Sequence, residues 1–129
     1  MTEVVIDTSA LLAWLGQEPG WEKVEQAFAT SACKISAVNL AELVAKTSER
    51  MREPDEILAM VSALPVEVVP FDRAQAFAAG ALRVATRTLG LSLGDRACLA
   101  LSTTLGATAL TADKPWLALS IGVHIECIR

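Results

Sequence analysis

Four acidic residues stand where their carboxylates could act together. Asp7 follows a short apolar run, Glu42 lies in the segment after the second such run, and Asp95 and Asp113 end the sequences Leu-Ser-Leu-Gly-Asp and Leu-Thr-Ala-Asp. Carboxylates that share a pocket repel one another, and some take up a proton unless a cation neutralises them. Oxygen ligands without a neighbouring His or Cys select Mg²⁺ or Mn²⁺ over zinc.

This donor set favours one class of reaction. A divalent ion can lower the pKa of a bound water, orient that water for attack and stabilise the charge on a phosphodiester. We therefore expect a metal-dependent nuclease if the four carboxylates converge.

Each acid also has a structural interpretation. Asp7 and Asp113 could cap the helices that follow them, Asp95 could form a capping box with Ser92, and Glu42 could lie on a solvated helix face. Capping and metal binding are compatible, because both occur at helix N-termini. The joint placement of four acids favours a site over four separate accidents.

The elements that would position these acids alternate between strand and helix. Short apolar and β-branched runs predict strands over residues 3–6, 33–35, 66–69, 107–110 and 123–127. Apolar periodicity and capping residues predict helices over residues 10–15, 20–29, 36 to about Met51, 54–64, 72–89, 92–105 and 113–119. In the helix over 72–89, Phe77 is expected on the buried stripe with Ala74, Ala78, Ala81, Leu82, Ala85 and Leu89.

Five strands that alternate with helices imply a mostly parallel sheet covered on both faces, an α/β fold in a three-layer α/β/α sandwich. The functional edge of such a sheet lies at the carboxyl ends of its strands, where the four acids are expected to meet. Asn39 precedes Glu42 by three residues and shares its helix face.

Composition limits the alternatives. The 129 residues contain no linker or repeat, which predicts a single domain over 1–129. The net charge of −4 argues against a non-specific nucleic-acid coat, but not against a nuclease with a local basic rim. No apolar run is long enough to span a membrane, and Glu3 and Asp7 do not suit a signal peptide, so a cytoplasmic location is expected. Cys33, Cys98 and Cys127 and the single His124 are interpreted as structural.

Four sequence motifs carry a resemblance to a known family. They are Val-Val-Ile-Asp-Thr-Ser-Ala-Leu-Leu-Ala (4–13), Ser-Ala-Val-Asn-Leu-Ala-Glu-Leu (36–43), Leu-Ser-Leu-Gly-Asp-Arg-Ala-Cys-Leu-Ala-Leu-Ser (91–102) and Leu-Thr-Ala-Asp-Lys (110–114). In order and spacing the chain resembles the PIN-domain ribonucleases, and in particular the VapC-type toxins of type II toxin–antitoxin systems. The resemblance covers essentially the whole chain.

The resemblance implies a sheet of order 3-2-1-4-5 and a Mg²⁺- or Mn²⁺-dependent endoribonuclease. It assigns the metal and catalytic positions to Asp7, Glu42, Asp95 and Asp113. Supporting hydrogen bonds would come from Thr8, Ser9, Asn39 and Thr111. It also implies a homodimer and a small cognate antitoxin protein that occupies a groove and blocks the site.

Several residues keep two interpretations. Arg83 and Arg87, at spacing i,i+4 on the outer face of the long helix, and Arg96 and Lys114, beside two of the acids, could contact RNA phosphates or could be solvated. Trp14, Leu15 and Trp21 could belong to the core or line an antitoxin groove.

Other functions fit less well. A phospho-accepting receiver domain needs paired acids after strand one and an Asp after strand three, where Pro70 stands. A haloacid-dehalogenase-like phosphatase needs a second Asp at position 9, where Ser9 stands. A non-catalytic PIN scaffold, or an RNA-processing nuclease that is not a toxin, remains open; Asp7→Asn would separate a scaffold from an enzyme.

Overall fold

A five-stranded parallel sheet organises the chain, of which the computed structural model describes residues 2–50 and 53–129. The strand order is β3-β2-β1-β4-β5, and every neighbouring pair is parallel. The strands are β1 (Glu3–Ile6), β2 (Ala32–Ser36), β3 (Glu67–Val69), β4 (Thr108–Thr111) and β5 (Ile125–Cys127). Both the predicted α/β class and the order 3-2-1-4-5 are confirmed.

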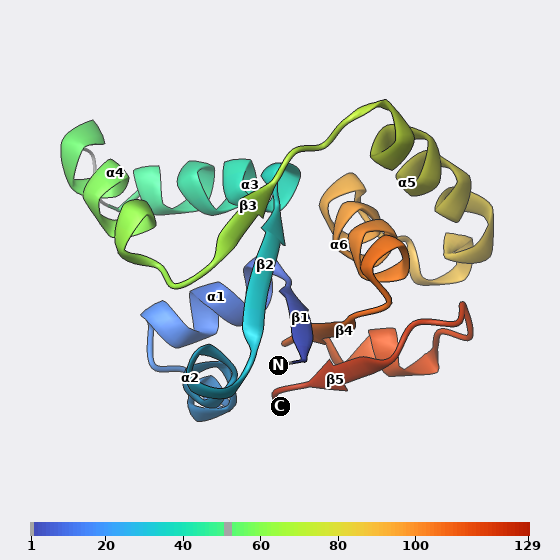
Figure 1. The fold of residues 1–129 in the computed structure, drawn as a ribbon, viewed down its shortest axis with the longest axis horizontal. Helices are drawn as coiled ribbons and strands as arrows, with labels where there is room; N and C mark the ends of the chain where they lie inside the picture. Colours follow the sequence, from blue (N-terminus) through green and yellow to red (C-terminus); the bar gives the residue numbers. More distant parts are fainter. Residues whose placement is uncertain (1, 51–52) are drawn as a thin grey trace.

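Helices cover both faces of this sheet. They are α1 (Thr8–Leu15), α2 (Trp21–Thr30), α3 (Ala37–Ser48), α4 (Pro54–Ala63), α5 (Arg73–Ala85) and α6 (Leu93–Leu105), with 3-10 helices η1 (Arg87–Leu89) and η2 (Lys114–Ala118). Figure 1 shows α1 to α4 to the left of the sheet and α5 and α6 to its right, which makes the three predicted layers. No helix in the described ranges is both long and apolar enough to cross a membrane.

Two apolar cores lie on opposite faces of the sheet. Neighbouring residues of a strand point to opposite faces, so Ile6 packs in the core beneath α1, α2 and α3, whereas Val5 packs in the core beneath α6. Trp116 of η2 is fully buried in the second core. All three cysteines are free and buried, as predicted.

The buried face of α5 differs from the predicted stripe. Phe77 is 80% exposed, whereas Gln75 and Ala79 face the protein. The Gln75 amide donates a hydrogen bond to Thr104 Oγ1 of α6 (2.7 Å). The face that packs on α6 is the one that carries the Gln75 hydrogen bond and the Ala79 carbonyl, which accepts from Arg96 of α6 (2.9 Å).

The predicted helix over 72–89 is also too long. It ends at Ala85, and the Thr86 hydroxyl donates to the Leu82 carbonyl (2.8 Å) before η1 begins. Arg83 and Arg87 therefore lie on successive elements rather than on one helix face, and both are exposed.

Smaller boundary differences occur elsewhere. The first helix begins at Thr8 rather than residue 10, the element over 114–118 is a 3-10 helix, and the last strand begins at Ile125 rather than residue 123. Met51, predicted to end the stripe of the third helix, lies outside the described residues.

A candidate metal site at the carboxyl edge of the sheet

The central strands deliver the candidate residues to one edge. Asp7 stands between β1 and α1, Thr111 ends β4, and α3, which carries Asn39 and Glu42, starts immediately after β2. The first turn of α6 brings Asp95 to the same place, because α6 packs against both β1 and α3. The parallel topology thus gathers residues that are far apart in the sequence.

Asp7 is the buried centre of this edge. Its side chain is 3% exposed, and although Asp7 occupies the N-cap position of α1, its carboxylate caps no backbone N–H. Asp7 Oδ2 accepts hydrogen bonds from Ser9 Oγ (2.6 Å) and Thr111 Oγ1 (3.0 Å). Asp7 Oδ1 has a longer contact, 3.5 Å, with Asn39 Nδ2.

Burial raises the pKa of Asp7 to about 6. This value is a net result: burial, the largest cause, and the negative charges of Asp95 and Glu42 raise the pKa, while the hydrogen bonds from Ser9 and Thr111 lower it. Because the charges of Asp95 and Glu42 act on Asp7, these three carboxylates lie in one electrostatic environment. A bound cation would offset the repulsion that the Asp95 and Glu42 carboxylates exert on an ionised Asp7.

Ser9 and Thr111 form a small hydroxyl network around Asp7. Their oxygens lie 3.2 Å apart. Ser9 Oγ also accepts from the backbone N–H of Ala112 (3.0 Å), and Thr111 Oγ1 accepts from that of Asp113 (3.1 Å). The network ties the loop after β4 to the carboxylate that follows β1.

Glu42 is held by side chains from two helices. Its Oε1 accepts from Asn39 Nδ2 (3.2 Å) and lies 3.2 Å from Thr8 Oγ1. The Thr8 hydroxyl is also 3.0 Å from the Asn39 carbonyl, so its single proton serves one of the two acceptors at a time. Glu42 therefore does not lie free on a solvated face.

Asn39 links these groups to α6. It is fully buried, and its Nδ2 donates to the carbonyl of Gly94 (3.0 Å) in addition to Glu42. Its Oδ1 is buried without a hydrogen-bond partner among the described residues. The Gly94 carbonyl fixes which end of the amide faces the carboxylates.

Asp95 forms the predicted capping box. Its Oδ2 accepts from the backbone N–H of Ser92 (2.9 Å), and its own N–H donates to Ser92 Oγ (3.2 Å). This contact orients the carboxylate at the N-terminus of α6 and occupies one of its two oxygens.

Asp113 is less tightly connected. It is half-buried at the N-cap position of η2, but its carboxylate makes no cap hydrogen bond there. Its backbone N–H reaches Thr111, whereas no hydrogen bond or ion pair within the described residues joins its carboxylate to the other three acids. The structure thus brings Asp7, Glu42 and Asp95 together and leaves Asp113 beside them.

The donor set fits a hard divalent cation. Glu42 and Asp95 each use one carboxylate oxygen in hydrogen bonds within the described chain and leave the other free, and Asp7 Oδ1 has only its long contact with Asn39. Within residues 2–50 and 53–129, no three His, Cys, Asp or Glu side chains are arranged so that they could hold a metal ion as they stand. The carboxylate oxygens match Mg²⁺ or Mn²⁺ in chemistry, but the side chains would have to draw closer to bind either ion.

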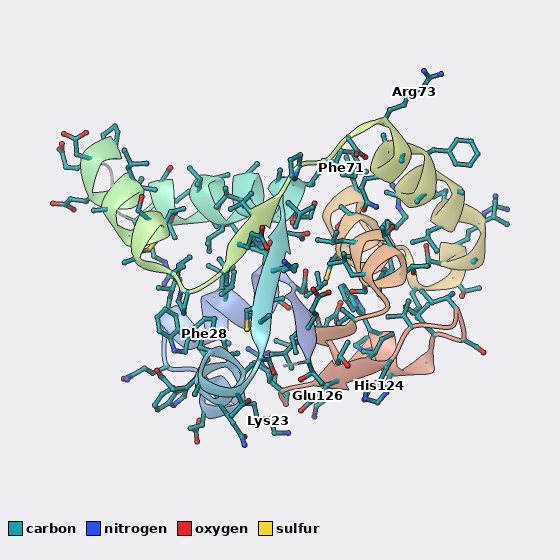
Figure 2. All side chains as sticks on the ribbon, viewed as in Figure 1. Lys23, Phe28, Phe71, Arg73, His124 and Glu126 are labelled. Atoms are coloured by element: carbon teal, nitrogen blue, oxygen red, sulfur yellow. The ribbon has the colours of Figure 1, made fainter. Side chains whose placement is uncertain are left out.

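The other polar candidates lie outside this cluster. Figure 2 shows His124 at the bottom of the view, far from α3. Lys114, which follows Asp113, is exposed. Arg96 Nη1 donates to the Ala79 carbonyl of α5 (2.9 Å), and its Nε is buried without a partner in the described part of the chain. Arg96 therefore joins α6 to α5 through at least one of its nitrogens.

Two residues next to the carboxylates were not expected there. Gly94 contributes its carbonyl to Asn39, and Cys98 is buried near Asp7, Asp95 and Glu42, whose charges, after burial itself, raise the pKa of its thiol. The sequence contained one signal for Gly94, a glycine within a predicted helix. It contained none that distinguishes Cys98 from an ordinary core cysteine.

Two hollows with mixed apolar and polar linings lie on the α1 side of the sheet. One, of about 320 Å³, is lined by Trp14, Leu15 and Trp21. A larger hollow, of about 720 Å³, lies among α1, α3 and α4 and includes Leu15, Lys46 and Met60. The Trp14 ring packs edge-on against Phe28 with centroids 5.1 Å apart. Trp14 and Leu15 therefore both pack against the core and line a hollow, whereas Trp21 lines the hollow without joining either core.

Comparisons with known proteins agree with this architecture. The sequence profile of the PIN domain matches residues 4–120. A search of curated protein sequences finds no match.

Solved structures of toxin–antitoxin proteins share the fold. A DNA-bound VapBC from Salmonella typhimurium has 19% identity and a TM-score of 0.76, with all of both chains covered. A toxin–antitoxin complex from Klebsiella pneumoniae has 16% identity and a TM-score of 0.75, with 98% of each chain covered. VapC20 of Mycobacterium tuberculosis, a sarcin–ricin loop cleaving toxin, has 19% identity and a TM-score of 0.71, with 94% of this chain and 98% of that chain covered.

Proposed function

The chain belongs to the PIN-domain family, and from this premise we propose that it is a metal-dependent endoribonuclease that acts as the toxin of a toxin–antitoxin pair. The proposal takes residues 1–129 as one PIN-like domain. The observation that carries it is that the charges of Glu42 and Asp95 lie near the buried carboxyl of Asp7, whose pKa is raised to about 6.

The four acids have distinct roles in this proposal. Asp7, Glu42 and Asp95 would hold Mg²⁺ or Mn²⁺, and Asp113, in the loop after β4, would complete the ligand set. When bound, the ion supplies an activated water and stabilises the charge of the phosphodiester. No side chain is required to form a covalent bond with the RNA.

The surrounding residues hold the carboxylates in place. Ser9 and Thr111 donate to Asp7 and favour its ionised form. Thr8 and Asn39 hold the Glu42 carboxylate in place through its Oε1. A cation binds the ionised form of Asp7, so binding displaces the proton from that carboxyl. Because the pKa of Asp7 is about 6, metal binding should strengthen as the pH rises through 6.

The RNA backbone is expected to meet positive charge at the rim. Lys114 adjoins Asp113, and Arg83 and Arg87 lie exposed on α5 and η1. Arg96 can contact a phosphate only through nitrogens that its bond to Ala79 leaves free. These local positive charges would attract the RNA, although the net charge of the chain is −4.

A cognate antitoxin and a homodimer are part of the same proposal. The similar structures include toxin–antitoxin complexes. The two hollows on α1, α2, α3 and α4 offer the antitoxin a surface that combines apolar side chains such as Trp14, Leu15 and Met60 with charged ones such as Lys46. Such a toxin would act in the cytoplasm, where its RNA substrate is found.

Two alternatives are separable by experiment. Purified, antitoxin-free protein is incubated with total cellular RNA in Mg²⁺, in Mn²⁺ and in EDTA, beside Asp7→Asn and the surface control Asp55→Asn. The proposal predicts discrete fragments that require metal, persist in Asp55→Asn and vanish in Asp7→Asn.

A PIN scaffold without catalysis would give no cleavage and no rise in melting temperature with metal. A nuclease that processes RNA without being a toxin would cleave equally well, but its overexpression would not arrest growth.

A further inference from the structure

The first turn of α6 contains a glycine that its backbone does not require. Gly94 is buried and helical, and it is not among the glycines with positive φ in the described chain. Alanine is a better helix former than glycine at such a position. The reason for glycine must therefore come from what packs against it.

The neighbour of Gly94 is the Glu42 carboxylate. A Cβ added to Gly94 would lie 2.1 Å from Oε1, 2.4 Å from Cδ and 2.5 Å from Oε2 of Glu42. These distances are far below any van der Waals contact. The whole carboxylate group therefore occupies the space that a side chain at position 94 would fill.

Glu42 is also held by donors from α1 and from its own helix, α3. Asn39 Nδ2 and Thr8 Oγ1 both approach Oε1, and the same Asn39 nitrogen donates to the Gly94 carbonyl. The carboxylate is thus confined between these donors and α6. It cannot retreat from α6 without stretching its hydrogen bonds.

We propose that Gly94 is a positioning residue for Glu42: its missing side chain lets the Glu42 carboxylate lie against the first turn of α6, beside Asp7 and Asp95. The inference rests on the proposed function, because it assumes that Glu42 serves a metal site. It goes further by assigning a role to a residue that touches neither ion nor RNA.

An alanine at position 94 should separate folding from site geometry. The atoms that it would meet belong to the end of a flexible side chain, so Glu42 can rotate away and the fold persists. Rotation breaks the contacts with Asn39 and Thr8 and moves the carboxylate from Asp7. The chain offers a matched control in Gly80 of α5, where an added Cβ meets nothing within 4 Å.

The test measures Mn²⁺ affinity by titration calorimetry and the melting temperature without metal. Gly94→Ala is expected to melt at the wild-type temperature or higher and to bind Mn²⁺ about 10–100-fold more weakly, as for loss of a group that orients a metal ligand. Gly80→Ala should melt slightly higher and bind Mn²⁺ like the wild type. Wild-type affinity in a folded Gly94→Ala variant would overturn the inference.

A double substitution tests the size relationship directly. Glu42→Asp shortens the side chain by one methylene and alone weakens Mn²⁺ binding. In the double variant Glu42→Asp/Gly94→Ala, the fold-loss of Mn²⁺ affinity should be much smaller than the product of the two single fold-losses. The reason is that the shorter side chain no longer meets the new Cβ. Multiplicative losses would show that position 94 acts independently of Glu42.

A second readout needs no metal. The side-chain amide resonances of Asn39 should shift in metal-free Gly94→Ala and stay unchanged in Gly80→Ala. If the wild type binds no Mn²⁺, the proposed function fails, and this inference fails with it. If the wild type binds Mn²⁺, Asp7→Asn does not, and Gly94→Ala binds normally, only the inference about Gly94 fails.

Discussion

Asp7→Asn should make the metal-free protein more stable while removing its metal site. The buried Asp7 carboxyl has a pKa of about 6 in the folded protein, against an ordinary aspartate pKa of 3.8. A difference of about 2 pKa units means that keeping Asp7 ionised at pH 7 costs the folded state about 3 kcal/mol. Asparagine keeps an acceptor for Ser9 and Thr111 without the charge, so we expect a gain of about 2–3 kcal/mol in the free energy of unfolding.

The sign of the pH dependence follows from the same shift. Between pH 3.8 and about 6 the folded protein holds a proton on Asp7 that the unfolded chain has lost, so the free energy of unfolding falls as the pH rises through this window. The advantage of Asp7→Asn should therefore be near zero at pH 4 and complete above pH 6.

Urea unfolding in EDTA at several pH values measures this difference. Asp55→Asn, an exposed acid in the first turn of α4, removes the same charge and should give no gain. Added Mg²⁺ should then stabilise the wild type but not Asp7→Asn, because only a folded state with a site gains from binding. An Asp7→Asn variant that is less stable than the wild type at pH 7 and equally responsive to Mg²⁺ would refute the reasoning.

Three further predictions concern neighbouring residues. Thr111→Val removes a donor to Asp7 without changing side-chain shape; it should weaken Mn²⁺ binding about fivefold at pH 7, for a loss of ~1 kcal/mol, and calorimetry at several pH values should show binding displaced to higher pH. Ser92→Ala removes the cap of α6 and should lower the free energy of unfolding by about 1 kcal/mol in urea, but Asp95 keeps its bond to the backbone N–H of residue 92, so Mn²⁺ affinity should change little. Lys114→Gln should weaken RNA binding and its salt dependence while Mn²⁺ affinity stays constant; a salt dependence equal to the wild type's would place residue 114 outside the RNA contact.

The sequence was informative wherever a pattern has one physical solution. Short β-branched runs separated by helices can bury both faces only in a covered parallel sheet, which is why the architecture could be predicted. That topology then places the ends of β1, β2 and β4 at one edge, so the approach of Asp7 to Glu42 was also predictable.

The sequence was ambiguous where several faces were equally apolar. The alanine-rich α5 allowed more than one buried stripe, and Phe77 was placed inside although it lies in solvent. The choice depends on contacts of Gln75 and Ala79 with α6, from residues 17 to 29 positions away. Such pairings do not leave a periodic signal in either helix.

The details of the site required the three-dimensional arrangement. The hydrogen bond from Thr8 to Glu42 joins residues 34 positions apart, and that from Asn39 to Gly94 joins residues 55 apart. The motifs identified which residues meet, but not which oxygen of each carboxylate is engaged. The close approach of Glu42 to Gly94 likewise depends on how α3 packs against α6.

The most direct test of the account follows the oxygen that enters the product. RNA is cleaved by the wild-type protein with Mg²⁺ in water enriched in ¹⁸O, and the fragment ends are analysed by mass spectrometry. If metal-activated water is the nucleophile, fragments carry a 5′-phosphate that contains ¹⁸O and a 3′-hydroxyl, and none form with EDTA or with Asp7→Asn. Fragments that end in 2′,3′-cyclic phosphate, or cleavage that survives EDTA and Asp7→Asn, would contradict the central claim that the carboxylates around Asp7 bind the metal that cleaves RNA.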